Sequence, residues 1–182
     1  DVGDEGYKVE AVIEGTGTGI DSVDYSDFNG DGIKELIIGW KIDGNNQILN
    51  VYNMKDYQAA RVIMTDYTEY VIEDLDGDNI SELAVVRMAS GDIRGEVEAY
   101  SMAADGEVVS STAYLSSGAE SISKLRTGYL VEDINAVFIE STYGESGTIT
   151  DVFALQNGVV KNISADNATG ISQDTIRLNS VY

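Results

Sequence analysis

The sequence predicts an all-β fold, and two observations lead to this prediction. Short segments in which apolar and polar residues alternate recur along the chain between glycine-rich or acidic turns, as in half-buried strands. In addition, an acidic turn that runs directly into an apolar, β-branched segment occurs at 27–39 and again at 74–86. Together, the strand pattern and the repeat indicate an array of antiparallel strand units.

The expected strands follow one another at short spacing. The second acidic turn begins 47 residues after the first, from Asp27 to Asp74, and this shift lies within the period of the blade repeats of β-propellers, about 40–50 residues. Strands are expected at 7–14, 20–25, 36–41, 47–53, 58–64, 82–88, 95–102, 107–114, 136–141, 150–158 and 176–182.

Each acidic turn places oxygen-bearing residues at its relative positions 1, 3, 5 and 9. Oxygens at this spacing in a tight turn converge on one point, and calcium takes about six to eight oxygen ligands. The main-chain carbonyl at position 7 would complete the set, so the side chain there is free to turn into the core. The expected ligands are Asp27, Asn29, Asp31, Ile33 and Glu35 in the first loop and Asp74, Asp76, Asp78, Ile80 and Glu82 in the second.

Position 6 of such a loop requires a positive φ. Gly32 adopts it freely, and Asn79 is one of the few other residues that visit this region. A helix–loop–helix calcium motif would instead close with a glutamate at position 12, where this chain has Ile38 and Val85. We therefore expect two calcium sites that lead into strands rather than helices.

An acidic loop of this form, followed by an apolar strand, resembles the FG-GAP or VCBS repeat of integrin α-subunits and many bacterial surface proteins. The resemblance implies β-propeller blades of four antiparallel strands, with calcium in the turn between the first two strands of a blade. The Phe-Gly and Gly-Ala-Pro elements are absent and the chain has no proline, which favours the bacterial VCBS-like branch. The wider spacing is also similar to that of VCBS-repeat lipoproteins of Gram-positive bacteria.

One propeller-like domain over 1–182 is expected, with about three blades. It divides into a blade end at 1–19, blades at 20–65 and 66–118, a degenerate blade at 119–165 and the start of the next blade at 166–182. In the degenerate blade the acidic loop is shortened to 132–135, so no calcium is expected there. The partial ends predict a segment of a larger or incomplete propeller, whose cut edges associate with another copy or with the rest of a longer chain.

Composition excludes several classes of function. The chain has 32 acidic and 11 basic residues, a formal net charge of −21, which argues against nucleic acid and anionic membranes as partners. It has no histidine and no cysteine, which removes Ser-His-Asp and Cys-His catalysis and histidine-based metal sites. No apolar run is long enough to span a membrane. The missing initiator methionine and leader are expected of a mature or processed form.

The predicted function is a calcium-binding, non-enzymatic module, extracellular or on the cell surface, that mediates protein or glycan interaction. A purely structural repeat of a larger envelope protein is the alternative. A carboxylate-based carbohydrate-active enzyme is a further one, although the closely spaced acidic residues are already used by the two loops. Trp40 is expected in the core rather than stacked on a sugar, and Tyr67, near a loop, is expected to be exposed.

Overall fold

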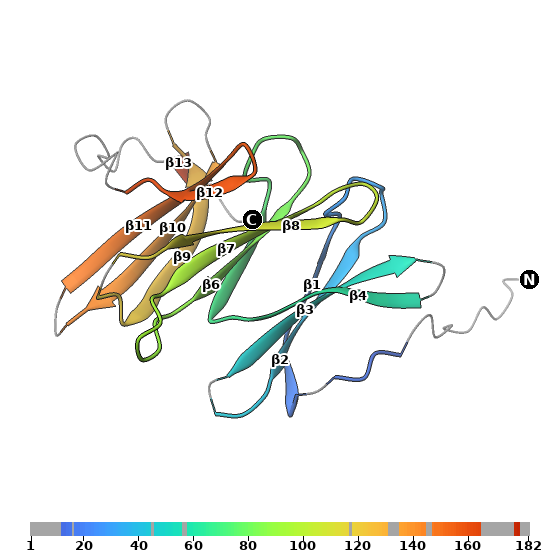
Figure 1. Ribbon diagram of the computed structural model, residues 1–182, viewed down its shortest axis with the longest axis horizontal. Helices are drawn as coiled ribbons and strands as arrows, with labels where there is room; N and C mark the ends of the chain where they lie inside the picture. The colour runs from blue at the N-terminus through green and yellow to red at the C-terminus, as the bar shows by residue number, and fades with distance from the viewer. Residues whose placement is uncertain are drawn as a thin grey trace, which may run out of the picture.

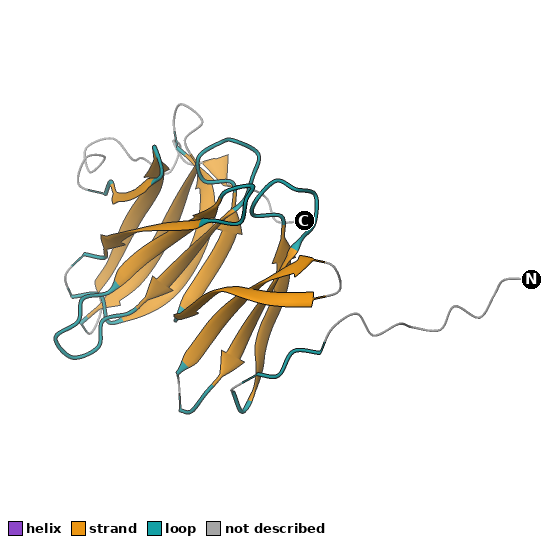
Figure 2. Ribbon diagram, turned by 45° about the vertical axis from the view of Figure 1, so that its right-hand side comes forward, coloured by secondary structure: helices purple, strands orange, loops and turns teal. Residues whose placement is uncertain are grey.

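The computed structural model of the chain describes residues 12–15, 17–44, 46–55, 58–116, 118–130, 135–144, 147–164 and 177–178. Within these ranges every regular element is a β-strand and there is no helix (Figure 2). The prediction of an all-β fold is therefore confirmed. No described segment forms a helix of the length and apolarity needed to cross a membrane.

Three antiparallel sheets follow one another along the chain (Figure 1), and their strands meander in sequence order except for the last strand of the third sheet, which pairs with the first strand of that sheet. Sheet 1 contains β1 (Gly19–Ser26), β2 (Glu35–Lys41), β3 (Gln47–Lys55) and β4 (Gln58–Asp66). Sheet 2 contains β5 (Glu69–Glu73), β6 (Glu82–Arg87), β7 (Glu96–Met102) and β8 (Val108–Tyr114). Sheet 3 contains β9 (Ser121–Tyr129), β10 (Asn135–Tyr143), β11 (Gly147–Gln156), β12 (Val159–Asn162) and the short β13 (Arg177–Leu178).

The middle sheet is covered on both faces, which explains the continuous apolar run in β6. Leu83 and Val85 pack toward sheet 1, whereas Ala84 and Val86 pack toward sheet 3. Successive residues of a strand point to opposite faces, so a strand buried on both sides must be apolar at every position. All four side chains are fully buried.

The two end sheets carry a second apolar cluster on the face turned away from sheet 2. In sheet 1 this outer cluster contains Ile38, Trp40 and Tyr52, which alternate along their strands with residues that face sheet 2. In sheet 3 the corresponding cluster is built around Phe138. The expectation that Trp40 lies in the core is confirmed, because its side chain is buried in the outer cluster of sheet 1.

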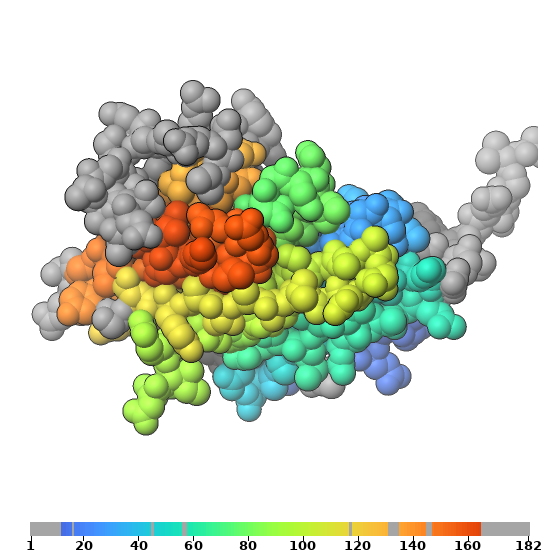
Figure 3. All heavy atoms as spheres, turned by 45° about the horizontal axis from the view of Figure 1, so that its top comes forward, coloured from blue at the N-terminus to red at the C-terminus, as the bar shows by residue number. Residues whose placement is uncertain are grey.

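Sheets 2 and 3 are also joined along their outer strands. The Val160 amide donates to Ser111 Oγ at 2.8 Å, and Asn162 Nδ2 donates to the Tyr114 carbonyl at 3.0 Å. Figure 3 shows the segment of β12 lying against β8 on this side of the molecule. The buried Asp151 carboxylate adds a further link, because it accepts from the amide of Ser116 at 2.9 Å.

The two ends of the chain differ from the expected strands. Of the segment 7–14, residues 7–11 lie outside the described residues, and the described residues 12–15 are not in a strand. At the other end, Arg177 and Leu178 pair with β9 of sheet 3. The prediction from the sequence had placed 166–182 at the start of the next blade. Residues 132–134 of the shortened loop lie outside the described residues, and Asn135 begins β10.

Tyr67 was expected to be exposed, and this prediction is wrong. Its side chain is only 7% exposed and belongs to the cluster between sheets 1 and 2. Its hydroxyl donates to Asp21 Oδ2 at 2.9 Å, next to Gly39. The absence of a side chain at Gly39 leaves space for the Tyr67 hydroxyl. The position of Tyr67 near a loop in the sequence gives no sign of this packing.

Candidate metal centres

Both acidic loops connect the first two strands of a sheet. The first joins β1 to β2 and the second joins β5 to β6. In each, the residue that precedes the loop pairs across the ladder with the position-9 glutamate: Ser26 with Glu35, and Glu73 with Glu82. The two loops therefore begin and end at equivalent places, one in sheet 1 and one in sheet 2.

The carboxylate at position 1 organises each loop in the same way. Asp27 accepts from the amides at positions 4 and 6, with Gly30 N to Oδ1 at 2.7 Å and Gly32 N to Oδ2 at 2.9 Å. Asp74 does the same, with Gly77 N to Oδ1 at 2.7 Å and Asn79 N to Oδ2 at 2.9 Å. The two loops therefore adopt the same turn, with equivalent hydrogen bonds.

The backbone at position 6 is left-handed in both loops. Gly32 has a φ of 84° and Asn79 a φ of 70°, which confirms the steric requirement read from the sequence. Such angles are uncommon for residues other than glycine, and asparagine is among those that tolerate them.

The side chains at positions 3 and 5 accept from amides two residues further on. Asn29 Oδ1 accepts from the Asp31 amide at 3.0 Å, and Asp76 Oδ1 accepts from the Asp78 amide at 3.2 Å. Asp31 and Asp78 in turn each accept from the position-7 amide at 2.7 Å. These bonds fix the side chains at positions 3 and 5 against the backbone of their own loop.

The glutamates at position 9 are buried. Glu35 is 0% exposed and Glu82 is 3% exposed. Glu35 Oε2 accepts from the Phe28 amide at 3.0 Å, and Glu82 Oε2 accepts from the Leu75 amide at 2.8 Å. Among the described residues, neither carboxylate has a lysine or arginine within ion-pair distance.

Burial without a cation changes the acidity of these groups. Desolvation, together with the neighbouring Asp76, Asp78 and Asp74 carboxylates, raises the pKa of Glu82 to about 7. Desolvation also raises the pKa of Glu35. A carboxylate that is buried beside other carboxylates is costly to ionise unless a cation joins it.

The second loop brings three carboxylates together. One oxygen each from Asp74, Asp76 and Asp78 lies within 4.8 Å of the others. In the first loop, position 3 is the buried Asn29, whose Nδ2 lies 3.4 Å from both Asp31 Oδ2 and Glu35 Oε1. The second loop therefore gathers three carboxylate oxygens around one point, whereas in the first loop the Asn29 amide nitrogen donates to two of the carboxylates.

The position-7 isoleucines differ in their surroundings. Ile33 is 44% exposed, so its side chain does not turn into the core as the sequence allowed. Ile80 is half-buried, and its Cδ1 atom would lie 2.9 Å from a Cβ atom added to Gly30. The second loop therefore rests against the first.

Four residues next to the loops were missed by the sequence reasoning, and the first is Asn53, whose Nδ2 donates to Glu35 Oε1 at 3.3 Å. Ser26 Oγ donates to Ser81 Oγ at 3.0 Å, which joins the two loops. Asn135 Nδ2 donates to the Asp74 carbonyl, while Asn135 Oδ1 is buried and has no hydrogen-bond partner among the described residues. Asn135 is the first residue of β10, as Glu35 and Glu82 are the first residues of β2 and β6. This equivalent position in the repeat was the signal from which a role for Asn135 could have been predicted.

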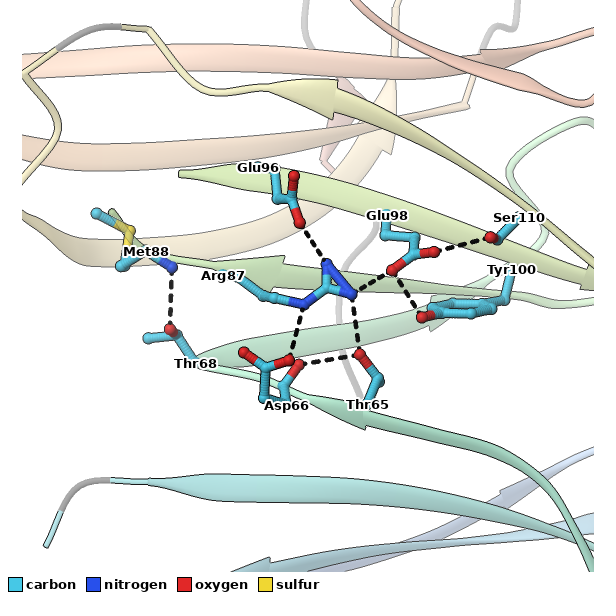
Figure 4. A network of polar contacts seen from close by, with 9 residues as sticks. All are labelled: Thr65, Asp66, Thr68, Arg87, Met88, Glu96, Glu98, Tyr100 and Ser110. Atoms are coloured by element: carbon cyan, nitrogen blue, oxygen red, sulfur yellow. Dashed lines mark hydrogen bonds and ion pairs between the residues drawn. The ribbon is translucent and has the colours of Figure 1, made fainter. Parts of the chain in front are cut away.

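A second polar cluster, centred on Arg87 of β6, contains acidic residues outside the loops (Figure 4). Arg87 pairs with Asp66 of β4 at 3.4 Å, with Glu96 of β7 at 2.9 Å and also with Glu98. Glu98 Oε2 further accepts from the Tyr100 hydroxyl at 2.7 Å. Each of these carboxylates already has a cationic partner, so the cluster joins sheet 1 to sheet 2 and offers no free acid–base pair.

Comparisons with models of protein families, with curated proteins and with solved structures each gave no match. The interpretation of the two loops therefore depends on their own geometry.

Proposed function

We propose that this chain is a calcium-binding, non-enzymatic module of an extracellular or cell-surface protein, with one calcium in each acidic loop. The observation that carries the proposal is Glu82, a carboxylate that is only 3% exposed, lies beside an acidic cluster and has no basic partner among the described residues. An ionised carboxylate of this kind costs several kcal/mol to bury unless a cation compensates it. Glu35 is likewise buried without a basic partner among the described residues, although it also accepts from the side-chain amides of Asn29 and Asn53.

The donor set favours calcium over other cations. The groups around each loop centre are carboxylate, amide and main-chain oxygens, and the chain has no histidine or cysteine to supply nitrogen or sulfur ligands. Calcium accepts six to eight such oxygens in a flexible arrangement, whereas magnesium retains several of its waters. Main-chain carbonyls at Ile33 and Ile80 would complete the two sets.

We also propose that the three sheets are blades of an incomplete propeller of the FG-GAP or VCBS type. Each sheet is a four-stranded antiparallel meander, with β13 added to the third, and consecutive sheets pack face to face. Both acidic loops lie between the first two strands of a sheet, where that family holds calcium. The outer apolar clusters of sheets 1 and 3 support continuation of the array through further blades or a second copy.

A non-enzymatic role fits the acidic residues better than catalysis does. Two groups of neighbouring carboxylates in the described chain are the loop residues and the Arg87 cluster, and the latter are held by a guanidinium. The ligand class remains protein or glycan, and a purely structural segment of an envelope protein is the second candidate. That candidate is favoured by Trp40, which is buried and therefore offers no stacking surface for a sugar.

Thermal unfolding of chelator-stripped protein, with and without added calcium, tests the metal-binding proposal. Calcium binds the native state, so it should raise the melting temperature in a concentration-dependent way. The double variant D78N/E82Q should lose much of this increment. The exposed Asp92 lies outside both loops, so D92N removes a negative charge as a matched control and should keep the increment. No calcium effect on the wild type, or an equal loss in D92N, would overturn the proposal.

A further inference from the structure

The two acidic loops are in direct contact although they belong to different sheets. Ser26, just before the first loop, bonds to Ser81 at position 8 of the second, with 3.0 Å between the hydroxyl oxygens. The Ile80 side chain lies against Gly30, at position 4 of the first loop. One polar and one apolar contact therefore connect the two candidate sites.

Both contacts involve residues whose backbone is part of a site. Ile80 supplies the position-7 carbonyl of the second loop and is followed by Ser81 and Glu82, so ordering of this segment around an ion fixes the position of its side chain. On the other side, the Gly30 amide is held by Asp27 Oδ1 at 2.7 Å, and Gly30 has a positive φ of 70°. A displaced Ile80 would therefore disturb the residue that Asp27 organises.

The second loop is also held from its far side by sheet 3. Asn135 is only 6% exposed, donates to the Asp74 carbonyl and keeps an unpaired Oδ1 beside the loop. This unpartnered oxygen adds to the buried Glu82, which accepts from the Leu75 amide but has no basic partner among the described residues. The second loop also has Asp76 where the first has Asn29, and therefore one more negative charge.

We infer that the two calcium sites are coupled, so that occupation of the second loop raises the calcium affinity of the first through the Ile80–Gly30 and Ser81–Ser26 contacts. The inference rests on the proposed function. The second loop fills first because it has the larger negative charge and is held on both sides. Ordering of Ile80 and Ser81 then lowers the entropic cost of ordering the first loop, and by linkage the first site strengthens the second equally.

A titration that reads each loop separately tests the coupling. The amides of Gly32 and Asn79 report on the first and second loop, and both can be followed by heteronuclear NMR as calcium is added to chelator-stripped protein. Disabling the second loop with D76N/D78N should raise the calcium concentration at which Gly32 titrates by about fivefold or more, the lower range of measured allosteric couplings. Asn79 should no longer titrate in this variant.

The uncoupling variant I80A/S81A keeps every proposed ligand, because Ile80 contributes only its main-chain carbonyl. Here Gly32 should titrate at higher calcium than in the wild type, approaching its value in D76N/D78N, while Asn79 still responds. The matched control is I93A/S121A, since Ile93 is exposed and Ser121 forms a hydroxyl pair with Thr142 at 2.6 Å in sheet 3. It should leave both titrations unchanged.

The possible results separate the two proposals. If neither amide responds to calcium in the wild type, the proposed function fails and the coupling fails with it. If both respond but Gly32 titrates at the same calcium concentration in the wild type and D76N/D78N, the sites are independent and only the coupling is overturned. If a double variant does not fold, the single substitution S26A keeps the test decisive. It removes the Ser26–Ser81 contact from the side of the first loop. Gly32 should then titrate at a calcium concentration between those of the wild type and D76N/D78N.

Discussion

The hydroxyl of Tyr67 lies against Gly39, in the space that a side chain at that position would fill. Tyr67 belongs to the connection between sheets 1 and 2, and Gly39 lies within β2. The Ser22 hydroxyl occupies the same space from β1. The absence of a side chain at Gly39 thus allows the tyrosine to pack between the sheets.

The substitution Gly39→Ala should destabilise the protein. An added methyl group would overlap the Tyr67 hydroxyl and Ser22 Oγ, and overpacking of this kind costs about 1–3 kcal/mol. Urea unfolding would measure the loss. Gly19→Ala is the matched control, because nothing lies within 4 Å of a Cβ atom added at Gly19. Equal stability of the two variants would contradict this account of the packing.

Stability should fall at alkaline pH because two buried tyrosines resist ionisation. Burial raises the pKa of Tyr67 to about 12, with Asp21 adding to the effect, and burial also raises the pKa of Tyr70, whose hydroxyl bonds to Asp24. In the unfolded chain tyrosine ionises near pH 10. The unfolded state therefore binds fewer protons than the native state above that pH, so the free energy of unfolding falls from about pH 10 towards pH 12.

The variant Tyr67→Phe isolates this contribution. It should be less stable than the wild type near pH 8, because the hydrogen bond to Asp21 is lost, by about 0.5–1.5 kcal/mol. The difference should shrink as the pH rises above about 10, because phenylalanine does not ionise. Urea unfolding at a series of pH values measures this, and a constant difference would show that Tyr67 ionises normally.

Arg87 should be a strong contributor to the join between sheets 1 and 2. Replacement by methionine keeps much of the apolar stem but leaves the carboxylates of Glu96 and Glu98 facing each other without a cation. We expect a loss of about 2–3 kcal/mol in the free energy of unfolding. The exposed Arg61 of β4 provides the control, and R61M should be nearly neutral. A similar small effect for both variants would mean that the network contributes little.

Two buried carboxylates should respond differently to neutralisation. Asp151 is 0% exposed and accepts from Ser116, Asn162 and Ser164, so it is satisfied without a metal. Glu82 accepts from Leu75 alone among the described residues. In the absence of calcium, E82Q should therefore stabilise the protein, whereas D151N should destabilise it.

Thermal unfolding in chelator and in calcium separates the two cases. D151N should show the full stabilisation by calcium, and E82Q should show a reduced one. If E82Q is stabilised by calcium as much as the wild type, Glu82 is not a ligand.

The sequence was informative where the determinants are local. The oxygen spacing from Asp74 to Glu82 and the need for a positive φ at Gly32 and Asn79 are properties of a single turn, and the structure has both loops in equivalent form. The strand after each loop was likewise predicted, because a continuous apolar run such as Leu83–Val86 is typical of a strand covered on both sides.

Contacts between sheets could not be predicted in the same way. The burial of Tyr67, the Ser26–Ser81 contact and the bond from Asn135 to Asp74 depend on how consecutive sheets stack. No local spacing encodes that stacking. The pairing of Arg177 with β9 is also non-local, since the partner strand lies far back along the chain.

Calorimetric titration of the chelator-stripped protein with calcium tests the central claim most directly. The account predicts that each chain binds two calcium ions, and that D27N/D31N and D78N/E82Q each reduce the number to one. Heat changes no larger than those of dilution, or a stoichiometry unaffected by these substitutions, would contradict it.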